Sequence, residues 1–205
     1  NDNGRALLPR ALALLDGAAG VEQMARDSTA QAQSLRIGAS TTIGNYVLPT
    51  LMGQFLAGQQ VDRAFAWQSG VMIGNTAIVA AAVAAFELDI GLIEGPCHES
   101  TLEVKPWLQD ELVIVASPAH PLASSSPGLT VKSRVPVKTL RDAVWLLREA
   151  GSGTRETTDQ LVLPQLRSYR RSIEMGSSEA ILRAAAQGLG LACLSHWAVN
   201  DLIEA

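Results

Sequence analysis

Cysteine, basic charge and long apolar runs are all scarce in this sequence, and each scarcity narrows what the protein can be. Cys97 and Cys193 are its only cysteines, they lie far apart, and apart from the adjacent His98 neither has a second cysteine or histidine at ligand spacing. We therefore expect two reduced thiols in a cytoplasmic protein, with no disulfide, no metal site and no cofactor.

Acidic residues outnumber basic ones, with 20 Asp and Glu against 16 Lys and Arg, and the formal net charge is −4. Proteins bind DNA through clustered Lys and Arg, so we expect that this chain does not hold nucleic acid by itself. The longest apolar run, residues 77–86, is shorter than the roughly 18 apolar residues of a membrane span. The chain begins at Asn1 and shows no secretory signal, from which we expect a removed N-terminal part or a fragment.

The sequence also offers no set of residues arranged for catalysis. No Gly-x-Ser-x-Gly motif surrounds Ser152, and the three histidines stand in unrelated contexts. Glu94 follows a predicted strand, where it either lines a cleft or is a solvated loop carboxylate. We therefore expect no catalytic residues and no enzyme activity.

Predicted strands and helices alternate along almost the whole chain. With 205 residues and 47% hydrophobic residues, the chain has enough apolar material for one large domain or two small lobes. The alternation predicts an α/β fold with largely parallel sheets. The predicted strands are residues 35–39, 64–68, 88–93, 102–107, 112–116, 143–147, 171–175 and 191–194, and the predicted helices are 5–27, 44–57, 75–86, 154–166, 178–187 and 197–203.

Four strand-like runs end in small hydroxyl or amide residues, and a helix-like run begins at each of them. A helix start carries unpaired N–H groups and about half a positive charge. In an open α/β sheet these joints gather at the carboxyl ends of the strands, where ligands bind. We therefore interpret the chain as a sensor or carrier that binds a small anion at the joints 39–42, 74–76, 151–154 and 176–178.

The glycine-rich stretch Gly151-Ser152-Gly153-Thr154-Arg155 is the leading candidate within this set. Glycines allow backbone amides to approach a ligand closely, and the two hydroxyls add donors. Arg155 can face a carboxylate or another oxyanion with its two-pronged guanidinium. The alternative interpretation is a simple glycine-rich turn with Arg155 in solvent. An NTPase phosphate loop is excluded, because it needs a longer glycine spacing and a Lys.

Residues 35–40, 107–115, 119–123 and 188–192 carry a further signal through their order and spacing. Together they resemble the effector-binding region of LysR-type transcriptional regulators. The resemblance covers about residues 35–205, and residues 5–27 resemble the end of that family's linker helix. The stretches 151–155 and 176–179 are similar to a branch that includes regulators of sulfur assimilation and carbon fixation.

The resemblance implies a two-lobed periplasmic-binding-protein-like (type 2) α/β fold with two crossover strands. Residues 1–34 would be the linker helix and linker, residues 35–115 plus 194–205 one lobe, and residues 116–193 the other. A small effector would bind in the cleft between the lobes. The site residues carried over are Ser40, Thr41, Thr42, Asn75, Thr76, Gly151, Ser152, Gly153, Thr154, Arg155 and Ser177.

The resemblance also implies partners. The helix over residues 75–86 lacks a polar face, which suits a dimerisation helix or, equally, a covered interior helix. The full-length protein would form a tetramer and contact DNA only through an N-terminal helix-turn-helix outside this chain, and a C-terminal closing strand would also be missing. No contact with membranes is expected.

We expect the effector to be a sulfur oxyanion, a phosphate ester or a small carboxylate. One alternative is a solute-binding protein for a small anion, which would share the fold but carry an export signal or lipid anchor. An enzyme on the same fold is a third interpretation, against which stands the lack of a paired acid–base set.

Overall fold

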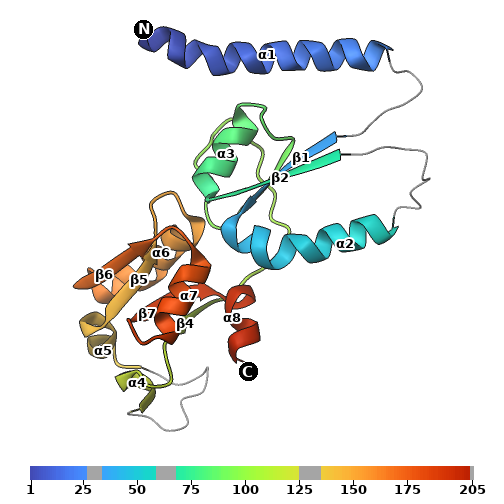
Figure 1. Cartoon of the computed structure of the whole chain (residues 1–205). Coiled ribbons are helices and arrows are strands. Elements are labelled where there is room, and N and C mark those ends of the chain that lie inside the picture. Colours follow the sequence, from blue (N-terminus) through green and yellow to red (C-terminus); the bar gives the residue numbers. More distant parts are fainter. Residues whose placement is uncertain (27–33, 59–67, 125–134, 204–205) are drawn as a thin grey trace.

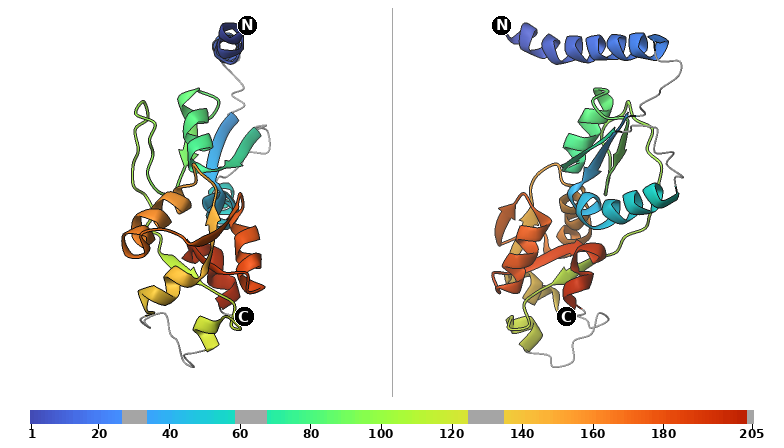
Figure 2. Two further views of the ribbon diagram at one scale, coloured as in Figure 1. Left: turned by 90° about the vertical axis from the view of Figure 1, so that its left-hand side faces the viewer. Right: turned by 45° about the vertical axis from the view of Figure 1, so that its right-hand side comes forward.

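The computed structural model describes residues 1–26, 34–58, 68–124 and 135–203. Two α/β units lie one above the other in Figure 1, each built on its own sheet. The N-terminal helix α1 (Asp2–Arg26) lies apart from both units in all three views of Figures 1 and 2. In the part of the chain that the structure describes, no helix combines the length and apolarity needed to cross a membrane.

The first unit is a three-stranded parallel sheet in the order β2-β1-β3, with β1 at Ser34–Ser40, β2 at Gln68–Gly74 and β3 at Ile90–Leu92. A π-helical turn, η1 (Ile43–Val47), and helix α2 (Leu48–Gly58) follow β1. Helix α3 (Thr76–Ala84) packs on the sheet through Val79, which is 0% exposed. The glycines below it allow this close packing: a Cβ at Gly91 would lie 2.9 Å from the Val79 side chain.

The second unit is a four-stranded sheet in the order β4-β7-β5-β6. Its strands are β4 (Leu112–Val115), β5 (Val144–Arg148), β6 (Arg171–Met175) and β7 (Leu191–Ser195). β4 runs antiparallel to β7, and the other pairs are parallel. The helices of this unit are α4 (Pro121–Ser124), α5 (Val137–Asp142), α6 (Gly153–Leu166), α7 (Ser178–Ala186) and α8 (His196–Ile203).

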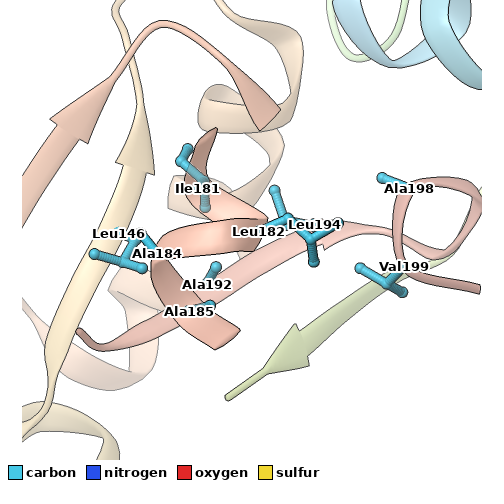
Figure 3. Packing of buried hydrophobic residues seen from close by; sticks show 9 residues of the cluster. All are labelled: Leu146, Ile181, Leu182, Ala184, Ala185, Ala192, Leu194, Ala198 and Val199. Carbon is cyan, nitrogen blue, oxygen red and sulfur yellow. The ribbon is translucent and has the colours of Figure 1, made fainter. Parts of the chain in front are cut away.

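Alternate residues of β5 supply the two sides of the core in the second unit, as the period of two in a strand requires. Trp145 and Leu147 pack toward α6, and Leu146 packs toward α7. Such a strand, buried on both faces, is typical of parallel sheets covered by helices. Figure 3 shows the α7 side, where the cluster consists of Leu146, Ile181, Leu182, Ala184, Ala185, Ala192, Leu194, Ala198 and Val199.

Most predicted elements are confirmed, within a few residues at their ends. The strand predicted at 102–107 is wrong, because these residues belong to no helix or strand. The strand predicted at 64–68 lies outside the described residues except for Gln68, where β2 begins. The division into lobes at residues 115 and 194 stays a prediction, although the pairing of β4 with β7 places both strands in the second sheet.

Candidate functional site

The four predicted strand-to-helix joints meet between the two units. A helical segment begins within five residues of the end of each of the strands β1, β2, β5 and β6. The Gly153 N–H donates to the Thr76 hydroxyl at 3.2 Å, which joins the second unit to the first. The Ala77 N–H donates to the Gly151 carbonyl at 3.0 Å in the same region. The structure thus brings these predicted joints together, and their binding of a ligand stays a prediction.

The side chain of Arg148 lies at the centre of this interface and is 3% exposed. Its Nη1 donates to the Ser178 hydroxyl at 2.8 Å, at the start of α7. Its Nη2 donates to the Thr41 hydroxyl of the first unit at 3.2 Å. Nε and Nη2 also donate to the two oxygens of Glu149, at 2.8 and 2.9 Å. One buried cation thus bonds to two of the four joints, and its partner Glu149 is bonded by Asn75 at a third.

Glu149 is the counter-charge of Arg148 and is also held by the first unit. The Asn75 side-chain N–H donates to its Oε1 at 3.2 Å, while the Asn75 carbonyl oxygen caps α3 by accepting from the Ile78 N–H. Burial alone would raise the pKa of the Glu149 carboxyl, but its hydrogen bonds and the Arg148 charge lower the pKa overall. Glu149 is therefore ionised and paired at neutral pH.

A second carboxylate, Glu94, approaches the interface from the loop after β3. The Thr154 hydroxyl donates to its Oε1 at 2.7 Å, and the Thr76 hydroxyl donates to its backbone carbonyl at 2.9 Å. Burial raises the pKa of the Glu94 carboxyl against the lowering effects of Thr154 and of the Arg148 charge. Of the two interpretations of Glu94, lining a cleft is the one that the structure supports.

A cavity of about 640 Å³ adjoins Glu94 and extends under the segment 102–108. Its polar lining includes Thr42, Glu94 and Thr154, while most of its other lining is apolar. Among the described residues, the buried hydroxyls of Ser40 and Thr42 complete no hydrogen bond, although Thr42 lies close enough to Glu94 to affect its pKa. An unsatisfied buried hydroxyl costs free energy, and Thr42, which lines the cavity, is placed to bond to a polar molecule there.

Several predicted site residues have local roles. Ser152 accepts from the Arg155 N–H and caps α6, and Ser177 accepts from the Ala180 N–H and caps α7. The Ser178 hydroxyl, next to Ser177, is the one that reaches Arg148. The Gly153 Cα lies directly against the Glu94 carbonyl, so this glycine serves the contact between the units.

Arg155 was predicted to face an anionic ligand or to lie in solvent, but its guanidinium is bound by groups of its own unit. Its guanidinium pairs with Asp159 at 2.9 Å and with Glu174 at 3.3 Å, and it donates to the Arg148 carbonyl at 2.8 Å. These partners neutralise its charge, so in this structure it is not a free counter-charge for a ligand.

Sequence reasoning missed Arg148, Glu149 and Ser178 as site residues. The signal was present, because Arg148 and Glu149 directly follow a buried strand and precede the glycine-rich loop. No group of three or more His, Cys, Asp or Glu within the described ranges is placed to hold a metal ion. Cys97 and Cys193 are both free thiols.

Two sheet units with buried polar groups between facing helix starts are an arrangement in which α/β proteins bind small ligands. The model of the LysR substrate binding domain family matches residues 28–205. The chain therefore belongs to this family, and the two-lobed fold and the family expected from the sequence are confirmed.

Two of the most similar relatives are transcriptional regulators. The chain is 42% identical over 205 residues to the uncharacterized HTH-type transcriptional regulator YeiE of Escherichia coli (strain K12), covering 100% of this chain and 64% of the relative. It is 36% identical over 171 residues to the HTH-type transcriptional regulator CysL of Bacillus subtilis (strain 168), covering 83% of this chain and 53% of the relative. The chain thus spans between about half and two thirds of these relatives.

Among solved structures, the regulatory domain of Synechocystis PCC6803 CcmR in complex with 2-PG is similar to this chain, with a TM-score of 0.66 and 30% identity over 81% of this chain and 74% of that one. A full-length OxyR variant from Pseudomonas aeruginosa has a TM-score of 0.65 and 25% identity, over 98% of this chain and 61% of that one. These relatives are regulators and not solute-binding proteins, and this chain matches the LysR substrate binding domain family.

Proposed function

We propose that this domain binds a small anionic metabolite between its two units and, in the cytoplasm, passes that event to a DNA-binding helix-turn-helix of the full-length regulator. The observation that carries the proposal is the buried guanidinium of Arg148, which bonds to Thr41 before η1 and to Ser178 at the start of α7, while Asn75 at the start of α3 bonds to its partner Glu149. A buried cation together with converging helix N-termini favours a negatively charged ligand.

The proposed ligand is a sulfur oxyanion, a phosphate ester or a small carboxylate. The unsatisfied hydroxyls of Ser40 and Thr42 supply donors for its oxygens, and Thr41, Asn75, Thr76 and Thr154 surround the same region. The complex of CcmR with 2-PG, at 30% identity, supports a small effector in a domain of this kind. Gly151, Ser152, Gly153, Arg155 and Ser177 support the site through the backbone and the helix caps.

The test is thermal unfolding of the purified chain against a panel of sulfur oxyanions, phosphate esters, carboxylates and neutral metabolites. A ligand at 100 times its Kd adds about 2.7 kcal/mol to the free energy of unfolding. For a chain of this size, the Tm should rise by roughly 5–10 °C. A rise with a neutral compound but with no anion would contradict the anionic site, and no rise with any member would contradict the sensing role.

For assembly, we propose a homodimer through the outward face of α3 and a tetramer in the full-length regulator. Ile78 is 53% exposed on this helix and Phe86, just after it, is 80% exposed. Helix α1 is the second candidate because it exposes several large apolar side chains, among them Leu14 at 76%. Exposed apolar surface of this kind is typical of interfaces between protein chains.

A further inference from the structure

We infer that Glu149 is a built-in competitor of the effector: its carboxylate occupies the place on Arg148 that the oxyanion takes when it binds. The inference rests on the proposed function, because it assigns the counter-charge of the proposed anion site. Binding is then an exchange in which Glu149 leaves Arg148 and the anion replaces it.

The geometry of the pair carries the first step. Glu149 presents two oxygens to Nε and Nη2 of Arg148, at 2.8 and 2.9 Å. Sulfate, phosphate and carboxylate groups all offer two oxygens with the same forked complementarity to a guanidinium. An anion of this class can therefore take over both bonds without any movement of Arg148.

The burial of the two partners decides which one moves. The Arg148 side chain is 2% exposed and is held from both units by Thr41 and Ser178. The Glu149 side chain is 26% exposed, and its further side-chain partner is the amide of Asn75. Glu149 can turn into solvent, whereas Arg148 cannot.

The exchange also satisfies the energetics of a buried charge. Removing one partner of a buried ion pair leaves an uncompensated charge and is strongly destabilising. With Glu149 in place before binding and the anion in place afterwards, Arg148 is paired in both states. The release of Glu149 also frees the Asn75 amide, which becomes a further donor to the anion.

The test is calorimetric titration of the wild-type chain and of Glu149→Gln with inorganic sulfate and inorganic phosphate, at ionic strength held constant with sodium chloride. Glu149→Gln removes the competing charge, so its affinity for at least one of these ions should rise tenfold or more. The matched control is Asp142→Asn. It removes one carboxylate from an exposed ion pair with Arg170 in the same unit, at 2.7 Å, and should bind as the wild type does.

Two further variants keep the result decisive. Arg148→Lys in the Glu149→Gln background keeps the positive charge but loses the two-pronged guanidinium. This double variant should lose most of the gain in anion affinity that Glu149→Gln shows. Should Glu149→Gln fail to fold by circular dichroism, Glu149→Asp keeps the charge but shortens its reach, and a gain of threefold or more is expected. If the variant that folds, Glu149→Gln or Glu149→Asp, binds the ions with wild-type affinity, the inference is overturned. A lower Tm with unchanged affinity overturns it as well.

The outcomes separate this inference from the proposed function. Tm rises of the wild type with panel anions, together with unchanged affinity in Glu149→Gln, would keep the function and overturn the exchange. Tight binding of sulfate or phosphate by Glu149→Gln, with no response of the wild type to the whole panel, would support the competitor and contradict the sensing role. Failure of Glu149→Gln to bind either ion overturns the exchange.

Discussion

Single glycines determine how closely the two units approach each other. A Cβ at Gly153 would overlap the backbone carbonyl of Glu94, and a Cβ at Gly95, whose φ is +73°, would lie 2.7 Å from the Gly153 carbonyl oxygen. Because both obstacles are backbone atoms, no rotamer change relieves them. The contact between Glu94 and the start of α6 therefore requires glycine at position 153.

Gly153→Ala should lower the free energy of unfolding by about 3 kcal/mol, the upper end for overpacking. For a chain of this length the Tm should fall by roughly 6–12 °C, measured by differential scanning calorimetry. The control is Gly176→Ala, where a Cβ would meet nothing within 4 Å. Equal Tm values for the two variants would contradict the close contact.

Glu94→Gln should make the stability less dependent on pH. The pKa of Glu94 is raised by burial, so the folded chain binds this proton more tightly than the unfolded chain. Its contribution is therefore fully present below the unfolded pKa and is lost as pH rises through the raised folded value. At pH 7 the variant should therefore be more stable than the wild type and unfold at a higher Tm. Thermal scans from pH 4 to 8 should show this advantage shrinking toward acid pH, and an advantage that grows there would contradict the assignment.

The sequence predicted joints that meet at the interface in the structure, but it did not predict every side chain that forms bonds there. Thr41, Asn75 and Thr154 were predicted and do bridge to other parts of the interface. Arg155 was chosen as the cation, whereas Arg148 occupies the centre. Both are arginines beside the same loop, and only the packed fold shows that the one at the end of β5 points between the units while the one on α6 finds Asp159.

At the scale of elements, strands and helices with clear periodicity could be predicted from the sequence. A short alternation of apolar and charged residues, in contrast, predicted a strand that the structure does not have. The stretch 102–107 alternates apolar Leu102 and Val104 with charged Glu103 and Lys105, which imitates a strand. A strand also needs a partner for its backbone groups, and in the described part of the chain this stretch pairs with none and instead borders the cavity. Helix α3 begins within one residue of its predicted start, and Asn75 caps it by accepting from the Ile78 N–H.

The assembly proposal is tested on α3 itself. Ile78→Glu should convert a dimer to a monomer in sedimentation velocity with little change in Tm, because this side chain is 53% exposed in the single chain. The neighbouring Val79 is 0% exposed, so Val79→Glu should unfold the chain and cannot report on an interface. A dimer that persists in Ile78→Glu would exclude this face, and Leu14→Glu on α1 would then test the second candidate.

At the scale of the whole molecule, the two units are joined by bonds on several sides of the cleft. Arg148 and Thr41 lie at the centre, Tyr46 of η1 donates to Glu179 of α7 at 3.0 Å, and His98 lies 2.8 Å from Glu156 of α6. The α/β architecture of the two units could be predicted from the alternation of strands and helices along the chain. The bonds between the units, however, join residues that are 58 to 133 positions apart in the sequence. Sequence periodicity carries no information on such pairs.

Because of these bonds, we expect the two units to stay together without ligand. We also expect contacts at the edge of the cleft, such as Tyr46 with Glu179, to determine how often the units separate. Tyr46→Phe removes the hydroxyl that donates to Glu179, and a hydrogen bond to a charged group contributes about 1.5 kcal/mol or more. Separation should therefore become roughly tenfold more frequent. Amide hydrogen exchange of Ala77, whose N–H donates to the Gly151 carbonyl across the cleft, should accelerate by that factor. The Val113 amide within the second sheet serves as the control and should exchange at the wild-type rate; equal acceleration of both amides would indicate general destabilisation and contradict hinge-like opening between the units.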